Sequence, residues 1–220
     1  MAQDLVILGA SGNALDILDV VEAINAKAPT WNVVGVLDDA KIAEGTFAGL
    51  AILGRLSDAQ RFDRAWFISA IGSDRSFRHR PRIVASTGVP LNRFATLIHP
   101  LAAVSARAKL GQGVCVNAGV SVAGNVAIGD CVSLGPGSIV GHDSSIENHA
   151  MLAPAAVVSG FCRIGVCCYL GAAATVRQRV RIGAGALVGM GAVVLADVEA
   201  GAVVIGNPAR VLERPVTPKS

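Results

Sequence analysis

The sequence lacks any long uninterrupted apolar run, although 52% of its 220 residues are hydrophobic and its mean hydropathy is +0.55. A membrane-spanning helix needs about 18 or more consecutive apolar residues. The longest uncharged stretch, residues 110–129, is broken by Gln112, Asn117, Asn125 and several glycines. Insertion into a membrane is therefore excluded, and we expect the surplus apolar surface to pack between subunits.

The sequence also lacks the pattern of a secretory signal peptide and any large cluster of positive charge. The first residues, Met-Ala-Gln-Asp, contain no basic region followed by an apolar core, which predicts a cytoplasmic protein. The net charge is only +3, and the basic residues are scattered apart from one cluster within residues 75–82. This pattern gives little support to nucleic-acid binding.

The five cysteines form no Cys-x-x-Cys pair, which is the usual spacing of a redox or zinc motif. They fall mostly at small or interior positions of the repeat described next, where a thiol behaves as a compact hydrophobic group. We therefore interpret them as core filler: Cys115, Cys131, Cys162, Cys167 and Cys168.

What the sequence does contain is an unbroken repeat of six residues. Seventeen successive sixth positions carry Leu, Ile or Val, namely Ile98, Val104, Leu110, Val116, Val122, Ile128, Leu134, Val140, Ile146, Leu152, Val158, Ile164, Leu170, Val176, Ile182, Val188 and Val194. A period of six matches neither the 3.6-residue helix nor the alternation of a strand, so each unit is expected to occupy an equivalent place in a repeat architecture.

The repeat unit reads aliphatic, often Gly, two variable residues, a small or β-branched residue, and one more variable residue. This pattern is typical of hexapeptide solenoids, in which a short strand with one inward aliphatic side chain is followed by a tight corner. Three units close one triangular coil, so residues 18 apart stack on each other. Residues 98–199 would form between five and six coils, with every sixth aliphatic residue inside.

The composition changes near residue 90, which predicts an N-terminal domain of residues 1–90 and a β-helix domain of residues 91–220. Residues 4–8 read as a buried strand, followed by a glycine-containing turn and a helix over about residues 13–25. The apolar residues Leu15, Leu18, Val21 and Ile24 of this stretch keep helical spacing. Further strands over residues 33–37 and 66–71 predict a Rossmann-like βαβαβ arrangement.

Polar groups gather where these strands end. Asp38 and Asp39 follow the second strand, and Asp74 follows the third. They either cap turns and helices or line a ligand pocket at the edge of a parallel sheet. The turn of residues 9–12 could offer backbone N–H groups to a phosphate, although a Gly-x-x-Gly spacing is a weak signal.

The most polar corner of the solenoid is Gly141-His142-Asp143. Counting 18 residues from His142 gives Gly124, Gly160 and then Gln178, so small residues flank the imidazole and a thin ligand would fit there. An imidazole can accept a proton near neutral pH, and a carboxylate on its other nitrogen would fix its tautomer. The alternative is a solvated surface pair, and His149 is interpreted as an interface or surface residue.

Several motifs together resemble the left-handed β-helix acyltransferases, and within them the sialic acid O-acetyltransferase family. They are the unbroken hexapeptides, Gly141-His142-Asp143, the ending Gly206-Asn207-Pro208-Ala209-Arg210, and Leu8-Gly9-Ala10-Ser11-Gly12, Leu37-Asp38-Asp39, Ala70-Ile71-Gly72 and Leu97-Ile98-His99-Pro100. That family includes N-acetyltransferases of nucleotide-linked 4-amino-4,6-dideoxysugars. The resemblance implies a left-handed parallel β-helix and a homotrimer with acetyl-CoA between neighbouring β-helices.

The resemblance also implies roles for particular residues. His142 would be the general base, Asp143 its orienting acid, and the Gly160 N–H the donor to the thioester oxygen. The nucleotide-sugar would lie on Gly9, Ala10, Ser11, Gly12, Asn13, Asp38, Asp39 and Gly72, with Asn117 and Met151 near the acceptor. Acetyl-CoA would contact Gly160, Arg177, Gln178, Arg179, Asn207, Pro208 and Arg210.

Three positions depart from the family pattern. Relatives often carry His at the positions of Asn13 and Met151, and Asn at the position of Gly135, whereas here Asn117 carries that side chain one coil earlier. These departures bear on the acceptor sugar and leave the reaction class unchanged.

The predicted function is acetyl-CoA-dependent N-acetylation of a nucleotide-linked 4-amino-4,6-dideoxysugar without a metal. One alternative is O-acetylation of a sialic acid or another sugar hydroxyl. Two others are a zinc site at a subunit junction, using His142 and His149, and a trimeric scaffold without catalysis.

Overall fold

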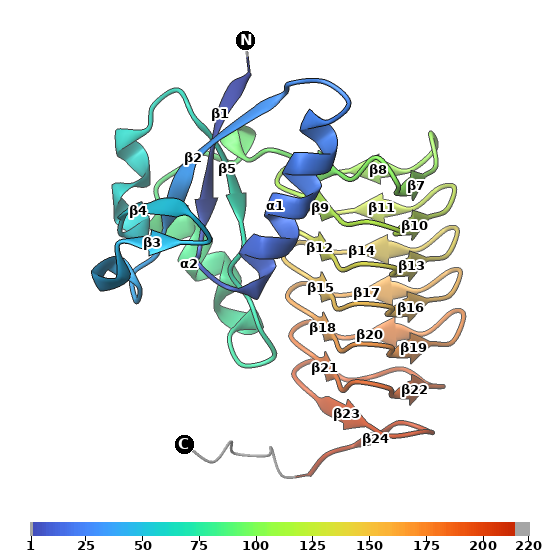
Figure 1. Cartoon of the computed structure of the whole chain (residues 1–220). Helices are drawn as coiled ribbons and strands as arrows, with labels where there is room; N and C mark the ends of the chain where they lie inside the picture. Colours follow the sequence, from blue (N-terminus) through green and yellow to red (C-terminus); the bar gives the residue numbers. More distant parts are fainter. Residues whose placement is uncertain (1, 214–220) are drawn as a thin grey trace.

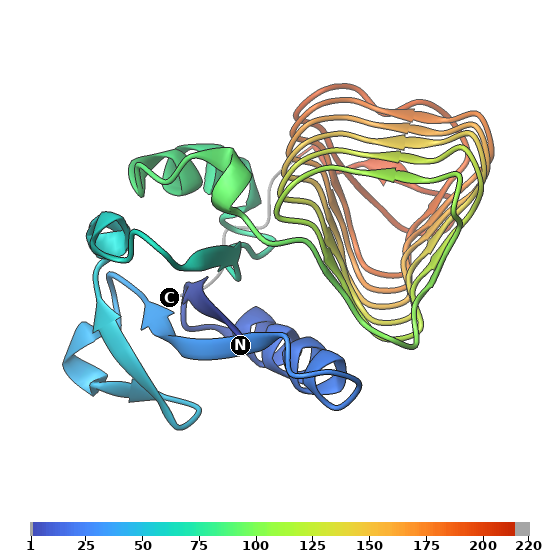
Figure 2. The ribbon, with the colours of Figure 1, turned by 90° about the horizontal axis from the view of Figure 1, so that it is seen from above.

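The computed structural model describes residues 2–213, so residues 214–220 of the expected second domain lie outside the described part. An α/β unit lies beside a triangular parallel β-helix (Figures 1 and 2). Among residues 2–213, no helix combines the length and apolar character needed to cross a bilayer. The predicted boundary near residue 90 falls just before a short 3-10 helix, η4 (Leu91–Arg93), that leads to the first coil.

The α/β unit is built on a five-stranded sheet in the order β3-β4-β2-β1-β5. Its strands are β1 (Gln3–Leu8), β2 (Trp31–Leu37), β3 (Thr46–Phe47), β4 (Leu50–Gly54) and β5 (Trp66–Ser69). All neighbouring pairs are parallel except β3 and β4. Residues 5–8 of β1 are fully buried, which is typical of a central parallel strand covered on both faces.

The helices of this unit differ in part from the expected ones. Helix α1 (Gly12–Asn25) is present, but it buries Ala14, Ile17, Val20 and Val21, while Leu15 is 48% exposed. Leu18 and Ile24 are half-buried against the same core, so Leu15 alone of the predicted apolar positions is exposed. The connection from β2 to β5 carries η1 (Ile42–Glu44), β3, β4 and η2 (Leu56–Arg61) in place of an α-helix. Residues after β5 form η3 (Phe77–His79) and α2 (Arg80–Ser86).

The β-helix has three faces. The docked face, which the α/β unit covers, contains β6 (Leu97–Ile98), β9 (Cys115–Val116), β12 (Ser133–Leu134), β15 (Met151–Leu152), β18 (Tyr169–Leu170), β21 (Leu187–Val188), β23 (Val203–Ile205) and β24 (Arg210–Val211). The neutral face contains β7 (Ala103–Val104), β10 (Ser121–Val122), β13 (Ile139–Val140), β16 (Val157–Val158), β19 (Thr175–Val176) and β22 (Val193–Val194). The charged face contains β8 (Lys109–Leu110), β11 (Ala127–Ile128), β14 (Ser145–Ile146), β17 (Arg163–Ile164) and β20 (Arg181–Ile182).

The predicted 18-residue register is confirmed in each face, as in the pairing of Val122 with Val104 and Val140. From Val116 to Val194 every sixth aliphatic residue is buried, and together these side chains form the core of the coil. The expectation that all seventeen lie inside was wrong for the first coil, where Ile98 is 39% exposed and Val104 and Leu110 are half-buried. The first coil has a neighbour on one side only, so its inward side chains are not fully covered.

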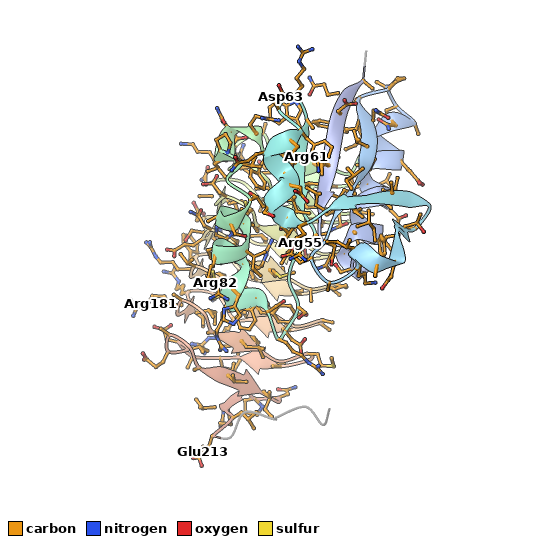
Figure 3. The ribbon with its side chains drawn as sticks, turned by 90° about the vertical axis from the view of Figure 1, so that its left-hand side faces the viewer. Arg55, Arg61, Asp63, Arg82, Arg181 and Glu213 are labelled. Atoms are coloured by element: carbon orange, nitrogen blue, oxygen red, sulfur yellow. The ribbon has the colours of Figure 1, made fainter. Side chains whose placement is uncertain are left out.

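Two arginines fasten the α/β unit to the β-helix. Arg80 is 1% exposed, and its guanidinium donates to the carbonyl oxygens of Cys131, His149 and Ala150. Arg78 donates to the carbonyls of Gly185 and Gly201, several coils further on. In contrast, Arg55, Arg61, Arg82 and Arg181, labelled in Figure 3, are exposed. The contacts of Arg78 and Arg80 fix which face of the β-helix the α/β unit covers.

Candidate active site

The predicted His142–Asp143 pair is formed at a corner between the neutral and charged faces. The two side chains are adjacent in sequence, and an extended backbone would point them to opposite sides. Asp143 instead has φ of 58°, in the left-handed region, and this turn brings its Oδ2 to 2.8 Å from His142 Nδ1. We call the corner of residues 141–144, with the residues stacked 18 apart from it, the His142 corner.

The charge of Asp143 determines which nitrogen of the neutral His142 imidazole carries the hydrogen. The hydrogen bond with His142, followed by one from Asn125, lowers the pKa of Asp143 below its ordinary value of 3.8. The carboxylate is therefore ionised at neutral pH and can only accept hydrogen bonds. His142 Nδ1–H must donate to it, which leaves Nε2 of the neutral imidazole free to accept a proton.

Gly160 lies directly beside the free nitrogen. A Cβ atom added to Gly160 would lie 3.0 Å from His142 Nε2, so only glycine allows the ring to take this place without a shift. Within residues 2–213, the Gly160 N–H donates to no protein acceptor, and the same holds for the N–H groups at positions 124, 142 and 178. The closeness of Gly160 to Nε2 distinguishes it from these other three.

Two further residues of the corner contact the dyad and were not predicted. The amide of Asn125 reaches Asp143, and the ring of Phe161 meets the imidazole edge-on, with centroids 5.0 Å apart and an angle of 86°. Arg179 in turn lies 4.8 Å above the Phe161 ring. Counting 18 residues from Asp143 would have found Asn125, Phe161 and Arg179, whereas the count made from His142 gave their neighbours.

The residues expected to meet acetyl-CoA fall in two nearby segments. Arg177, Gln178 and Arg179 are exposed on the His142 corner, one coil beyond Gly160. Asn207 and Pro208, in the segment between β23 and β24, and Arg210, the first residue of β24, are also exposed. That segment hydrogen-bonds to Val193 of β22 through Gly206 and Ala209, so it lies at the end of the neutral face.

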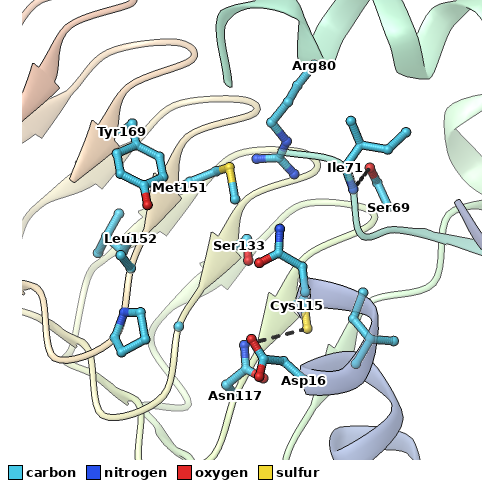
Figure 4. Close-up of a pocket in the computed structure, with 15 residues that line it drawn as sticks. Asp16, Ser69, Ile71, Arg80, Cys115, Asn117, Ser133, Met151, Leu152 and Tyr169 are labelled. Atoms are coloured by element: carbon cyan, nitrogen blue, oxygen red, sulfur yellow. Dashed lines mark hydrogen bonds between the residues drawn. The ribbon is translucent and has the colours of Figure 1, made fainter. Parts of the chain in front are cut away.

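The predicted acceptor residues meet in a separate place, a cleft between the α/β unit and the docked face (Figure 4). This interdomain cleft has about 530 Å³ of empty volume and is lined by Asn13, Asp16, Ile17, Ser69, Ile71, Arg80, Cys115, Asn117, Ser133, Gly135, Met151, Leu152, Ala153, Pro154 and Tyr169. All three departures from the family pattern therefore share one surface. Burial, and then the charge of Asp19, raise the pKa of the Asp16 carboxyl in it.

Contacts in the cleft account for two of the departures. Asn13 donates from Nδ2 to the carbonyls of Ala70 and Gly72, which ties the start of α1 to the end of β5. Met151 Sδ would clash with a Cβ atom on Gly72, so Met151 occupies the space that this glycine leaves.

The aspartates at the strand ends serve local structure. Asp38 accepts hydrogen bonds from the N–H groups of Ala10, Ala40 and Lys41 with its two oxygens. Asp39 accepts one from Leu56. Asp38 therefore holds the turn of residues 9–12 in place, which favours the turn-capping interpretation for this residue.

Within the turn of residues 9–12, some residues have a structural role and others do not. Gly9 has φ of 101°, and a Cβ there would lie 2.9 Å from Ile71, so its glycine is needed for the fold. Ser11 Oγ donates to the carbonyl of Ala70. In the described part of the chain no atom lies near the place of a Cβ on Gly12, and its φ is ordinary, so packing does not explain this glycine.

The two groups of site residues do not meet within one chain. The His142 corner joins the neutral and charged faces, and it is therefore the corner opposite the docked face on which the cleft lies (Figure 2). His149 lies at a different corner, where its carbonyl oxygen accepts from Arg80. Among residues 2–213, no three His, Cys, Asp or Glu side chains are placed to hold a metal ion.

Comparison with known proteins identifies the family of the chain. Residues 4–83 match the family model of the PglD N-terminal domain. The acetyltransferase domain of PglB from Neisseria gonorrhoeae FA1090 is 30% identical, with a TM-score of 0.82 over 96% of this chain and 100% of that one. The chain belongs to the NeuD/PglD-like family of sugar acetyltransferases. It is therefore an enzyme, and its solenoid is a left-handed β-helix as in other members of this family.

Two further structures of the NeuD/PglD-like family are similar over nearly the whole chain. PerB from Caulobacter crescentus, in complex with CoA and GDP-perosamine, is 30% identical with a TM-score of 0.80, covering 96% of this chain and 98% of that one. WeeI from Acinetobacter baumannii AYE is 26% identical with a TM-score of 0.81, covering 96% and 100%. No curated protein matches the chain in sequence.

Proposed function

We propose that this enzyme transfers the acetyl group of acetyl-CoA to the 4-amino group of a nucleotide-linked 4-amino-4,6-dideoxysugar. The observation that carries the proposal is the His142–Asp143 pair beside Gly160, whose N–H has no acceptor within residues 2–213. A proton acceptor and an oxyanion donor side by side are what acyl transfer to a nucleophile requires. The proposed substrates are in line with the CoA and GDP-perosamine bound to PerB and the acetyl-CoA bound to the PglB domain.

In the proposed reaction the neutral amine attacks the thioester carbonyl carbon directly. His142 Nε2 takes the proton from the nitrogen as the C–N bond forms, and Asp143 stabilises the resulting imidazolium. The Gly160 N–H donates to the oxygen that becomes negative. The C–S bond then breaks, and the proton held by His142 passes to the sulfur of the departing CoA. No covalent enzyme intermediate is required.

We further propose a homotrimer in which each site is shared between two chains. The outward residues of the neutral face are all small or uncharged: Ala103, Ser121, Ile139, Val157, Thr175 and Val193. The charged face instead exposes Lys109, Arg163 and Arg181. An uncharged face with exposed aliphatic side chains is suited to contact with another copy, and a three-fold ring closes such contacts. Packing there would bring the His142 corner close to a neighbouring chain.

Each substrate then has a proposed place. The phosphates of acetyl-CoA would meet Arg177, Arg179 and Arg210, whose guanidinium groups suit phosphate. The nucleotide-sugar would lie on the turn ending at Gly12, where the missing Cβ leaves room for a ligand. Its sugar would extend into the interdomain cleft beside Asn13, Asn117 and Met151. The His142 corner of a second chain would complete the site.

The test is a product assay with purified enzyme, acetyl-CoA and a panel of nucleotide-linked 4-amino-4,6-dideoxysugars. We expect thiol release only with amino sugars and a product carrying one added acetyl group on nitrogen by mass spectrometry and NMR. His142→Ala should lower kcat/KM by roughly a hundredfold or more. Acetylation of a sialic acid or another sugar hydroxyl, with none of the amine, would contradict the proposal.

A further inference from the structure

The carboxylate of Asp143 is held at both oxygens. Oδ2 accepts the hydrogen bond from His142 Nδ1 at 2.8 Å, and Oδ1 accepts one from Asn125 Nδ2 at 3.1 Å. Asn125 precedes Asp143 by 18 residues, so the β-helix stacks the two residues in successive coils. The result is a continuous chain of amide, carboxylate and imidazole along the His142 corner.

The His142–Asp143 pair is exposed to water. The side chains of His142 and Asp143 are 61% and 36% exposed. Water competes with exposed ion pairs and hydrogen bonds, which makes them weak when they depend on a single contact. A carboxylate with one partner can also rotate about its Cβ–Cγ bond and lose that contact. The second bond from Asn125 opposes this rotation.

Asn125 is itself fixed by the coil. It has φ of 61°, a left-handed conformation that asparagine tolerates better than most residues. Asp143, Phe161 and Arg179 adopt the same conformation in the next three coils. The side chains of this column therefore project from equivalent backbone positions, which places the exposed amide of Asn125 within hydrogen-bond distance of the Asp143 carboxylate.

We propose that Asn125 is a positioning residue for the acetyl transfer. By fixing the Asp143 carboxylate, it holds the His142 imidazole with Nδ1 protonated and Nε2 directed toward the reacting amine. The proposal rests on the proposed function of His142 as the base. In agreement with it, the hydrogen bond from Asn125 contributes to the lowered pKa of Asp143.

The test replaces Asn125 by glycine, which keeps the left-handed backbone and removes only the amide. We expect kcat to fall by roughly fivefold to tenfold, because one hydrogen bond to a charged group is lost. KM for both substrates should not change. Ala173→Gly is the matched control, since Ala173 has φ of 56° at another corner, and its kcat should equal that of the wild type.

A double-mutant cycle separates positioning from a structural effect. In the His142→Ala background, Asn125→Gly should cause no further loss, because the base it positions is absent. An equal loss in both backgrounds, or an unchanged kcat in the single variant, would overturn the proposal.

A second readout does not depend on turnover. Nitrogen-15 NMR of the imidazole should show the Nδ1–H tautomer of His142 in the wild type and a mixture of tautomers in Asn125→Gly. If the wild-type enzyme acetylates no amino sugar, the proposed function fails while this comparison still decides whether Asn125 orients the ring. Identical tautomer populations in the two proteins would refute the inference.

Discussion

At the scale of single residues, the candidate site depends on a glycine and a left-handed aspartate. Asp143 can reach its own neighbour only because its backbone turns at φ 58°, a conformation that costs most residues about 1 kcal/mol or more. Repeated hydrogen bonds between coils hold this turn, as between the Phe161 N–H and the carbonyl of His142. Gly160 leaves the space into which the imidazole fits.

Gly160→Ala tests that fit. The added Cβ would lie 3.0 Å from Nε2 and 3.3 Å from the His142 carbonyl oxygen, so the imidazole must shift. Because Gly160 does not have a left-handed φ, the backbone should accept alanine. We expect kcat to fall by roughly tenfold to a hundredfold, since catalytic groups tolerate little displacement, with little change in melting temperature.

The control is Gly124→Ala at the equivalent position two coils earlier. There the nearest atom is the flexible end of Arg107, at 2.9 Å, which can move aside. A Gly160→Ala enzyme as active as this control would show that the imidazole is not held against Gly160.

At the scale of the elements, the coil is stabilised by stacked aliphatic residues, each covered by the coils above and below. Leu134 is fully buried and pairs in register with Val116 and Leu152. Leu134→Ala should lower the free energy of unfolding by about 2–5 kcal/mol, because it leaves a cavity in a closed stack.

Ile98→Ala is the matched comparison, because Ile98 occupies the same repeat position but is 39% exposed in the first coil. Its cost should be about 1 kcal/mol or less, since little apolar area is lost from the core. Denaturant unfolding of both variants measures the difference. Equal losses would contradict the view that burial, and not the repeat position itself, determines stability here.

The contrast between Leu134 and Ile98 also shows what the sequence could predict. The period of six specified the coil, its register and the dyad at one corner, because every coil repeats the same local geometry. It could not specify which end of the stack is uncovered, nor that Leu15 lies at the exposed edge of α1, because Leu15 and Ile17 are equally suitable by sequence. Asn125 and Phe161 were missed because hydrogen bonds and ring contacts between coils depend on the phase of the corner.

At the scale of the whole molecule, the buried guanidinium of Arg80 is one attachment of the α/β unit to the β-helix. Burial lowers the pKa of Arg80 to about 10, and Arg80 still carries its charge at neutral pH. His149 lies beside it, and burial, with the charge of Arg80, lowers the pKa of His149 to about 4 from 6.5. Its buried Nδ1 has no hydrogen-bond partner among the described residues.

This environment predicts a dependence of stability on pH. The unfolded chain protonates His149 near pH 6.5, whereas the folded chain does so only near pH 4, so the folded state binds fewer protons between these values. The contribution of His149 is fully present above pH 6.5 and is lost as the pH falls toward 4. After allowance for its partial exposure, we expect about 1–2 kcal/mol.

Melting temperatures of the wild type and His149→Asn between about pH 7 and pH 4.5 measure this effect. Asparagine tolerates the left-handed φ of 61° at this position. The variant should lose less stability on acidification than the wild type. Parallel curves would show that His149 does not titrate differently in the two states.

The central claim at this scale is that each active site combines the His142 corner of one chain with the sugar-binding surface of another. Subunit mixing tests it most directly, by measuring acetyl transfer after co-expression of His142→Ala chains with Gly12→Asp chains, whose turn would repel the phosphates. Each variant alone should be inactive. Random assembly from equal amounts should restore about one quarter of the wild-type activity, because, over all trimers formed, one site in four would pair an intact corner with an intact turn. Mixed trimers without activity, from chains that each fold and assemble, would contradict a shared site.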